Sequence, residues 1–249
     1  MNRTDIHFHA LPGVDDGPAT LDESVELAAI AAAQGTRTIV VTPHVRRDFL
    51  TDVSDLPDRV RELQEELVRE GVHLDLRCGA ELGHEMVSRL RQSELETIAQ
   101  GPPGARWVLV ETPFGGLGPA FTAAADELRD RGFGVVVAHP ERAAGALDAG
   151  YSVLLHELAR GSVLQVNALS LDGRHGGESR AAGRRLVAEG LASVIASDAH
   201  GGWRMPALEL GVEQALEAGL GLGHAQRLVD GNPRRLLERG LVAWAFAAA

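Results

Sequence analysis

The chain has 249 residues, of which 45% are hydrophobic and 24% charged, and this ordinary globular composition argues against intrinsic disorder. The formal net charge is −11, from 24 basic and 35 acidic residues, so we expect no broad basic face for a nucleic-acid backbone and disfavour a nuclease. All 24 basic residues are arginine, which excludes a P-loop and any Schiff-base mechanism, because both require a lysine.

The single cysteine, Cys78, excludes an internal disulfide. Six residues later stands His84 instead of an arginine, so the Cys-x5-Arg spacing of a thiolate phosphatase is absent and thiol-dependent chemistry is not expected. No basic-then-apolar signal peptide opens the sequence. The apolar stretch 241–249 is too short to span a membrane and is interpreted as the apolar end of a C-terminal helix. We therefore expect a cytoplasmic protein.

Short apolar runs alternate with amphipathic segments along the whole chain. Most of the runs are rich in β-branched residues and too short for independent helices, so they predict buried parallel strands. The seven predicted strands are residues 4–8, 38–42, 73–78, 107–110, 134–138, 163–166 and 192–196.

Helical patterns fill the intervals. Thr20 and Glu23 form a capping-box signature before the first helix, which Gly35 ends. Further helices are predicted over residues 56–70, 119–131, 178–189 and 206–218, and a last short one starts at 232. This alternation predicts one α/β domain over 1–249, with a parallel sheet that is either closed into a barrel or left open.

Six of the seven predicted strands lead into a histidine or a carboxylate. In a barrel, chemistry lies at these carboxyl ends, which several strands supply together. In strand order, the residues are His7 and His9 with Asp15 and Asp16 in the next loop, then His44, Glu81, Glu111 and His139, and finally Asp198 with His200. The exception is the sixth predicted strand, which ends at Asn167.

A His-x-His pair alone is often a polar strand face, and a lone histidine is usually a hydrogen-bonded core residue. Burying this many ionisable groups at one end of a barrel, however, would cost a prohibitive desolvation free energy without cations to compensate their charge. The number of candidates implies two or three ions sharing carboxylates, and the absence of thiolates suits Mn, Fe or Zn. Asp5 faces the same side as His7 and either orients an imidazole or is satisfied by backbone.

Several motifs resemble the polymerase-and-histidinol-phosphatase (PHP) superfamily: Asp5-Ile-His-Phe-His9, Thr42-Pro-His44, Gly79-Ala-Glu81, Ala138-His-Pro140 and Ser197-Asp-Ala-His200. Four stretches resemble its CpsB/YwqE-type capsular-polysaccharide tyrosine-protein phosphatases: Val14-Asp-Asp-Gly17, Glu111, His139-Pro-Glu-Arg142, and Gln165-Val-Asn167 leading into Leu171-Asp-Gly173.

The resemblance implies a distorted seven-stranded β/α barrel that holds three divalent ions, with Mn favoured over Fe or Zn. Motif alignment favours Asp16 over Asp15 as a ligand. The implied ligand sets are His7, His9, Glu81 and Asp198 for the first ion; Glu81, Glu111 and His139 for the second; and Asp16, His44 and His200 for the third.

The implied activity is hydrolysis of phosphotyrosine in the tail of a bacterial tyrosine kinase of capsule or exopolysaccharide synthesis. Arg142 and Arg204 follow candidate ligands closely and are predicted to bind the phosphate through their bidentate guanidinium groups. His175 is interpreted as a loop residue. The sequence predicts no oligomeric state.

Some alternatives stay open. Arg46 and Arg47 line the rim for an acidic peptide or stay solvated, and solvation is favoured. Phe49, Phe114 and Trp203 either bracket an aromatic leaving group or pack the loops. The competing functions are a small-molecule phosphatase such as a histidinol-phosphate phosphatase, an amidohydrolase, which the absence of a bridging lysine disfavours, and a metal-free scaffold.

Overall fold

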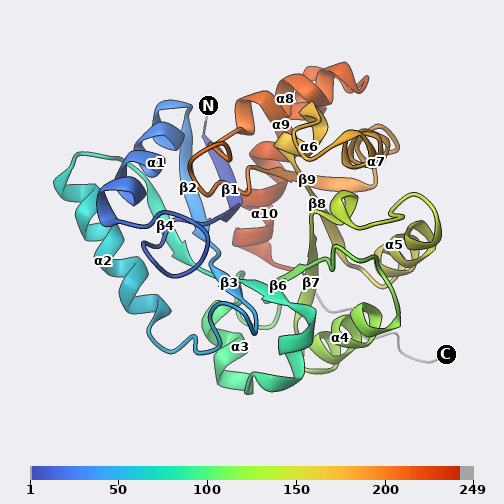
Figure 1. Ribbon diagram of the computed structural model, residues 1–249, viewed down its shortest axis with the longest axis horizontal. Helices are drawn as coiled ribbons and strands as arrows, with labels where there is room; N and C mark the ends of the chain where they lie inside the picture. The colour runs from blue at the N-terminus through green and yellow to red at the C-terminus, as the bar shows by residue number, and fades with distance from the viewer. Residues whose placement is uncertain (1, 242–249) are drawn as a thin grey trace.

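The computed structural model describes residues 2–241, so most of the apolar helix end predicted at 241–249 lies outside the described residues. Within this range, parallel strands are surrounded by helices (Figure 1). The strands are β1 (Arg3–Phe8), β2 (Thr36–Val41), β3 (His44–Val45), β4 (Asp75–Cys78), β5 (Glu81–Gly83), β6 (Trp107–Glu111), β7 (Gly134–Ala138), β8 (Val163–Asn167) and β9 (Ala192–Ala196).

The predicted helices are present, with ends shifted by two residues at most: α1 (Leu21–Ala33), α2 (Leu56–Arg69), α4 (Pro119–Asp130), α7 (Gly177–Ala188), α8 (Leu208–Glu217) and α10 (Gly231–Arg239). The Thr20 side chain accepts a hydrogen bond from the Glu23 backbone N–H, which confirms the predicted cap. The sequence does not predict α3 (Gln92–Ile98), α5 (Ala149–Ala159), α6 (Ala168–Asp172), α9 (Leu222–Val229) or the 3-10 helices η1 (His84–Arg89) and η2 (Pro140–Arg142). Over the described residues, no helix combines the length and apolar character needed to cross a membrane.

The seven-stranded barrel is not confirmed, because the described chain forms nine strands in two sheets, ordered β1-β2-β4 and β3-β5-β6-β7-β8-β9. Two of the predicted strands, 38–42 and 73–78, are each followed by a short strand that the sequence does not predict and that belongs to the other sheet, beyond Pro43 and beyond Gly79. Proline has no N–H for the ladder. At Gly79 a Cβ atom would lie 2.6 Å from Cγ1 of Val40, so the close approach there requires glycine.

On one side a backbone hydrogen bond joins the two sheets, since the Asp198 N–H donates to the His7 carbonyl at 3.0 Å. On the other side the chain itself passes from one sheet to the other, from β2 into β3 and from β4 into β5. The carboxyl ends of strands from both sheets therefore face a common region.

The interior between the sheets is filled by apolar side chains and sealed by α10. Leu236 and Leu237 of α10 pack against strand residues that include Ile6 and Trp107, all nearly fully buried. Trp107, the first residue of β6, also donates its indole N–H to the Leu236 carbonyl at 3.0 Å. Helix α10 thus closes the amino ends of the strands, opposite the region where the polar residues gather.

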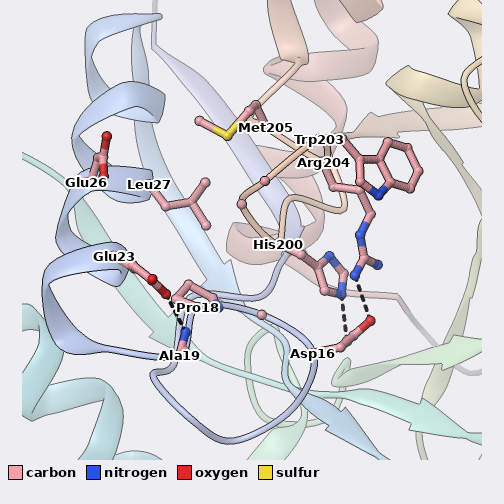
Figure 2. A pocket seen from close by; sticks show the side chains of 13 residues that line it. Asp16, Pro18, Ala19, Glu23, Glu26, Leu27, His200, Trp203, Arg204 and Met205 are labelled. Atoms are coloured by element: carbon pink, nitrogen blue, oxygen red, sulfur yellow. Dashed lines mark hydrogen bonds and ion pairs between the residues drawn. The ribbon is translucent and has the colours of Figure 1, made fainter.

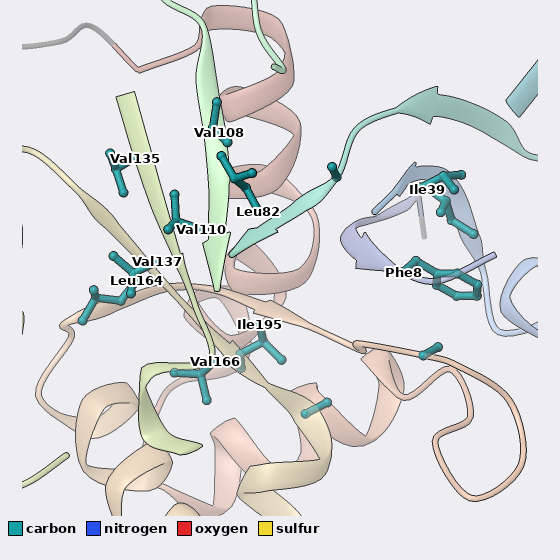
Figure 3. Close-up of a cluster of buried hydrophobic side chains, with 14 of the residues drawn as sticks. Phe8, Ile39, Leu82, Val108, Val110, Val135, Val137, Leu164, Val166 and Ile195 are labelled. Carbon is teal, nitrogen blue, oxygen red and sulfur yellow. The ribbon is translucent and has the colours of Figure 1, made fainter. Parts of the chain in front are cut away.

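The outward-facing side chains of the strands form one buried apolar cluster with side chains of the surrounding helices. Figure 3 shows strand members of this cluster, among them Val108, Val110 and Val137. Val108 and Val110 of β6 point outward, whereas Trp107 and Leu109 point inward, as period-two alternation requires. The same alternation turns Glu111, the last residue of β6, toward the interior.

Candidate metal centre

The nine side chains predicted as metal ligands lie in one connected group at the carboxyl ends of the strands. Eight of them are buried, and only Asp16, in the loop after β1, has an exposed side chain, at 41%. The group comprises His7 of β1, His9, Asp16, His44 of β3, Glu81 of β5, Glu111 of β6, His139 after β7, and Asp198 and His200 after β9.

Four of these side chains surround one point. The Nε2 atoms of His7 and His9 are 3.2 Å apart, and each lies 3.2–3.5 Å from Oε2 of Glu81 and from Oδ1 of Asp198. Ligands bound to one cation at about 2.1 Å stand about 3.0–3.4 Å apart in octahedral or tetrahedral geometry. The separations therefore suit a cation at the centre of this group.

Two further groups are compatible with an ion: His9, Asp16, His44 and His200, and His44, Glu81 and Glu111. Within each, the ligand atoms all lie within 4.8 Å of one another. The first of these contains the implied set Asp16, His44 and His200 with His9 added. The second differs from the implied set, because His44 and not His139 stands with Glu81 and Glu111. His139 instead directs Nε2 at Oε1 of Glu81, at 2.6 Å.

Several buried ligand atoms have no hydrogen bond, which is how a metal site differs from a salt-bridge network. These atoms are Nδ1 of His44, Oε2 of Glu81, Nδ1 of His139 and Nε2 of His200. Oε2 of Glu81 approaches three imidazoles at 3.0–3.4 Å without hydrogen-bond geometry to any of them. A buried unpaired polar atom costs about 1–3 kcal/mol, and a cation removes that cost. The donor set fits divalent transition metals.

Fixed acceptors orient three of the imidazoles. Nδ1 of His7 lies 2.9 Å from Oε1 of Gln165, Nδ1 of His9 lies 2.6 Å from Oδ2 of Asp15, and Nδ1 of His200 lies 2.9 Å from the Asp198 carbonyl. Each contact fixes a proton on Nδ1 and turns Nε2 toward the centre, where a bound cation would take the place of any Nε2 proton. Asp15 is therefore an orienting residue, while Asp16 stands among the candidate ligands.

A buried chain of amides connects His7 with Asp198. Besides accepting from His7, Gln165 donates through Nε2 to Oδ1 of Asn167 at 2.8 Å, and Asn167 donates through Nδ2 to Oδ2 of Asp198 at 2.7 Å. All four side chains are 0–2% exposed. The sequence motif contains both amides, but sequence reasoning predicts no role for them. The sequence feature that could have predicted this role is their spacing in β8, because residues two apart in a strand point to the same side, here the interior.

Three arginines reach the centre. Arg142 donates to Oδ2 of Asp198 at 3.0 Å, and Arg204 donates to Oδ2 of Asp16 at 2.6 Å. Arg46 donates to both oxygens of Glu111 at 2.8 and 3.1 Å, so the expectation that it is solvated is wrong, because a buried carboxylate lies within its reach. Its neighbour Arg47 is exposed.

The electrostatics are dominated by burial and by close opposite charges. Burial lowers the pKa of His7 and His9, but the neighbouring carboxylates outweigh it and raise these values to about 9 and about 10. Burial opposes ionisation of Glu81, yet the surrounding imidazoles hold its pKa well below the ordinary value. For Glu111, burial and the charge of Glu81 raise the pKa to about 7. The carboxylates therefore attract positive charge into the site.

The backbone is unusual at two residues of the centre. Among the described non-glycine residues, only His139 and Asp198 have positive φ, at 35° and 51°. Such conformations cost of order 1–3 kcal/mol and concentrate at functional sites.

Asp5 and His175 lie beside the centre without joining the ligand groups. Asp5 accepts hydrogen bonds from the backbone N–H of His7 and from both the N–H and the hydroxyl of Ser197, so backbone and serine satisfy it. His175, as expected, is a loop residue, with Nδ1 2.8 Å from Oγ of Ser170.

Two cavities flank the centre. The first, of about 500 Å³, runs from Asp16, His200 and Arg204 toward Leu27 and Glu26 of α1 (Figure 2). The second, of about 520 Å³, lies next to Phe114 and Arg142. The first cavity opens directly on two candidate ligands, so a substrate can reach the ligand group along Arg204, whereas the second adjoins the centre through Arg142.

Known proteins share this sequence pattern. A family model described as capsular polysaccharide synthesis, CpsB/CapC, matches residues 3–238. Over 199 residues the chain is 31% identical to tyrosine-protein phosphatase YwqE of Bacillus subtilis, covering 79% of this chain and 76% of that one. It is 26% identical to tyrosine-protein phosphatase CpsB of Streptococcus pneumoniae over 249 residues, covering 96% and 99% of the two chains.

Solved structures agree with the fold. A crystal structure from the study of YwqE and CpsB, described there as unique metal-dependent tyrosine phosphatases, superposes with a TM-score of 0.81 and 27% identity over 96% of both chains. The phosphotriesterase homology protein of Escherichia coli has the same fold with a TM-score of 0.65 at 14% identity, covering 94% of this chain and 98% of that one. With its motifs, fold and nearly full-length match in agreement, the chain belongs to the CpsB/CapC family of capsular polysaccharide synthesis.

Proposed function

We propose that this protein is a metal-dependent phosphatase that hydrolyses phosphotyrosine, acting on the tail of a tyrosine kinase of capsule or exopolysaccharide synthesis. The observation that carries the proposal is the convergence of eight imidazole and carboxylate side chains in three metal-compatible groups, with His139 in contact with Glu81 and with Arg142 and Arg204 at the edge. The names of its relatives, tyrosine-protein phosphatases YwqE and CpsB, support the substrate class.

Three ions are proposed, held by the nine candidate ligands, with Mn favoured and Fe or Zn as alternatives. His7, His9, Glu81 and Asp198 would hold one ion, and Glu81 would be shared with a second. When bound, such ions lower the pKa of water toward about 7 and neutralise phosphate charge.

The protein's own groups supply the remaining requirements. Arg142 and Arg204 bind phosphate oxygens with their forked N–H donors, and their present contacts to Asp198 and Asp16 place both forks at the edge of the ligand group. Gln165 and Asp15 hold the protons on Nδ1 of His7 and His9, which keeps both Nε2 atoms available as ligands. Glu81 is fully buried, so its charge acts on the bound ions with little screening by solvent.

A cysteine nucleophile is not part of this proposal. Burial raises the pKa of Cys78 to about 11, so its thiol stays protonated and weakly nucleophilic at neutral pH.

The test is a comparison of substrates with the purified protein supplied with Mn. A phosphotyrosyl peptide, a phosphoseryl peptide of the same sequence and histidinol phosphate are offered, and phosphate release is measured together with bound metal. We expect the phosphotyrosyl peptide to have the highest kcat/KM, and a chelator to abolish turnover reversibly.

Two variants make the comparison specific. Glu81→Ala should abolish turnover and lower the metal content, whereas Glu213→Ala, which removes an exposed carboxylate of α8, should change neither. A higher kcat/KM for histidinol phosphate would contradict the substrate assignment. Protein that binds less than one equivalent of metal and shows no rescue by Mn would favour the scaffold alternative.

A further inference from the structure

The phenylalanine and tryptophan side chains of the described residues fall into two groups. Four are buried in the core, among them Trp107 and Phe121. The other three, Phe49, Phe114 and Trp203, are 38%, 47% and 57% exposed and all lie around the candidate metal centre. Single exposed rings are ordinary, but loop packing, one of the two explanations left open by the sequence, does not account for three partly exposed rings gathered around one site.

Phe49 and Phe114 are oriented by stacking on imidazoles of the candidate ligand group. The Phe49 ring is stacked on the imidazole of His44, with centroids 5.1 Å apart and planes at 16°. The Phe114 ring is stacked in the same manner on His139, at 5.9 Å and 16°. Both phenyl rings therefore stand beside imidazoles of the ligand group.

The two imidazoles meet at one carboxylate. Nδ1 of His44 lies 3.0 Å from Oε2 of Glu81, and Nε2 of His139 lies 2.6 Å from Oε1 of the same residue. The two phenyl rings are therefore stacked on imidazoles that contact the two oxygens of a single buried side chain.

A guanidinium group accompanies each ring. Arg142 lies with Cζ 4.7 Å from the Phe114 centroid, and Arg46 lies with Cζ 5.7 Å from the Phe49 centroid. A phosphate bound by Arg142 would therefore lie next to Phe114. In an aryl phosphate, a single oxygen joins phosphorus to the ring, so the ring of the substrate would follow directly outside the phosphate site, beside the exposed part of Phe114.

We propose that Phe49 and Phe114 are the walls of an aryl slot and determine the preference of this site for aromatic over aliphatic phosphate esters. The inference rests on the proposed phosphatase function and identifies the residues that recognise its leaving group. Trp203 has no part in the slot, because it contacts His175 edge-on, at 5.5 Å and 75°, and stacks on no candidate ligand.

The test compares the wild type with Phe49→Leu, Phe114→Leu and the double variant. The measured quantity is the ratio of kcat/KM for a phosphotyrosyl peptide to that for a phosphoseryl peptide of the same sequence. Intrinsic reactivity differs between the two esters, but it cancels when the ratio of a variant is divided by the wild-type ratio. Trp203→Leu is the matched control, since it also removes an exposed ring beside an arginine.

Each single substitution should lower the ratio about three- to tenfold, mainly through a higher KM for the aryl substrate, as expected for one aromatic contact. The double variant should lower it about ten- to a hundredfold, and Trp203→Leu less than twofold. Bound metal should stay at the wild-type level in every variant.

Binding of two unreactive probes gives a readout that does not depend on turnover. Phenylphosphonate should bind the wild type more tightly than methylphosphonate, and the double variant should lose most of that difference. An unchanged probe difference and an unchanged substrate ratio in the double variant would overturn the slot. An equal loss of activity on both substrates together with loss of metal would also overturn it, because the rings would then only pack the ligands. A wild type that hydrolyses neither peptide would instead contradict the proposed function.

Discussion

Replacing Gln165 with leucine tests whether the buried amide chain controls metal binding. Leucine has a similar size but cannot accept the hydrogen bond from Nδ1 of His7 or donate to Asn167. The imidazole can then move its proton to Nε2, the atom that faces the centre. We therefore expect Gln165→Leu to weaken metal binding without removing a ligand.

The size of the effect follows from the two hydrogen bonds that the substitution removes. Two buried polar atoms, Nδ1 of His7 and Oδ1 of Asn167, lose their partner, and each unpaired group costs about 1–3 kcal/mol. Part of this cost destabilises the metal-free protein equally, so only the remainder weakens metal binding. Removal of an orienting partner typically weakens a metal site 10- to 100-fold, or about 1.4–2.8 kcal/mol. We expect the dissociation constant for Mn to rise by that factor.

Metal titration of chelator-treated protein measures this constant, and circular dichroism checks the fold. Gln214→Leu is the matched control, because Gln214 is also a buried glutamine, hydrogen-bonded to Arg184 away from the ligand group. It should lower stability without changing metal affinity. If folded Gln165→Leu bound Mn as tightly as the wild type, the amide chain would not orient the ligands.

Three further predictions concern separate parts of the molecule. Burial raises the thiol pKa of Cys78 to about 11, so iodoacetamide at pH 7.5 should leave phosphatase activity intact. Mass spectrometry should show that labelling of Cys78 becomes faster only as the pH approaches 11. Leu237→Ala, in the helix that seals the interior between the sheets, should lower the free energy of unfolding in urea by about 2–4 kcal/mol with KM unchanged; a wild-type midpoint would contradict the role of α10. Arg142→Ala should reduce kcat/KM roughly 10- to 100-fold, with only partial recovery in Arg142→Lys, and unaltered kinetics would remove this arginine from the phosphate site.

The sequence predicts the strands and main helices well because each depends on local patterning. Runs such as 134–138 and 192–196 correspond to β7 and β9 without any shift, since β7 is apolar and buried on both faces and β9 departs from that pattern only at Ser193. The missed helices are those whose sequence pattern is weak: α6 has five residues, and α5 is apolar around most of its circumference.

The division into two sheets is not predictable in the same way. Pro43 and Gly79 are visible in the sequence, but whether a strand merely ends there or continues in another sheet depends on its neighbours. At Gly79 the deciding contact is with Val40, a residue of another strand. Tertiary contacts of this kind leave no local pattern.

The ligand candidates are predictable because residue type and position at a strand end both point to them, whereas their orienting partners are not. Gln165 and Asn167 are amides, which carry no charge to suggest a role, and only their alternation within β8 turns them inward. The sequence favours solvent for Arg46 because a single sequence does not show that Glu111 lies across the site from it.

Backbone geometry singles out the same site without reference to residue type. Left-handed φ values at His139 and Asp198 cost free energy that the surrounding contacts must offset. For Asp198 these contacts are charged or fully buried: Oδ2 accepts hydrogen bonds from Arg142 and Asn167, and Oδ1 lies 3.2 Å from His7. Because strain of this kind persists only where many interactions fix the conformation, two strained residues in one ligand group indicate a site built to hold its side chains before any ion or substrate arrives.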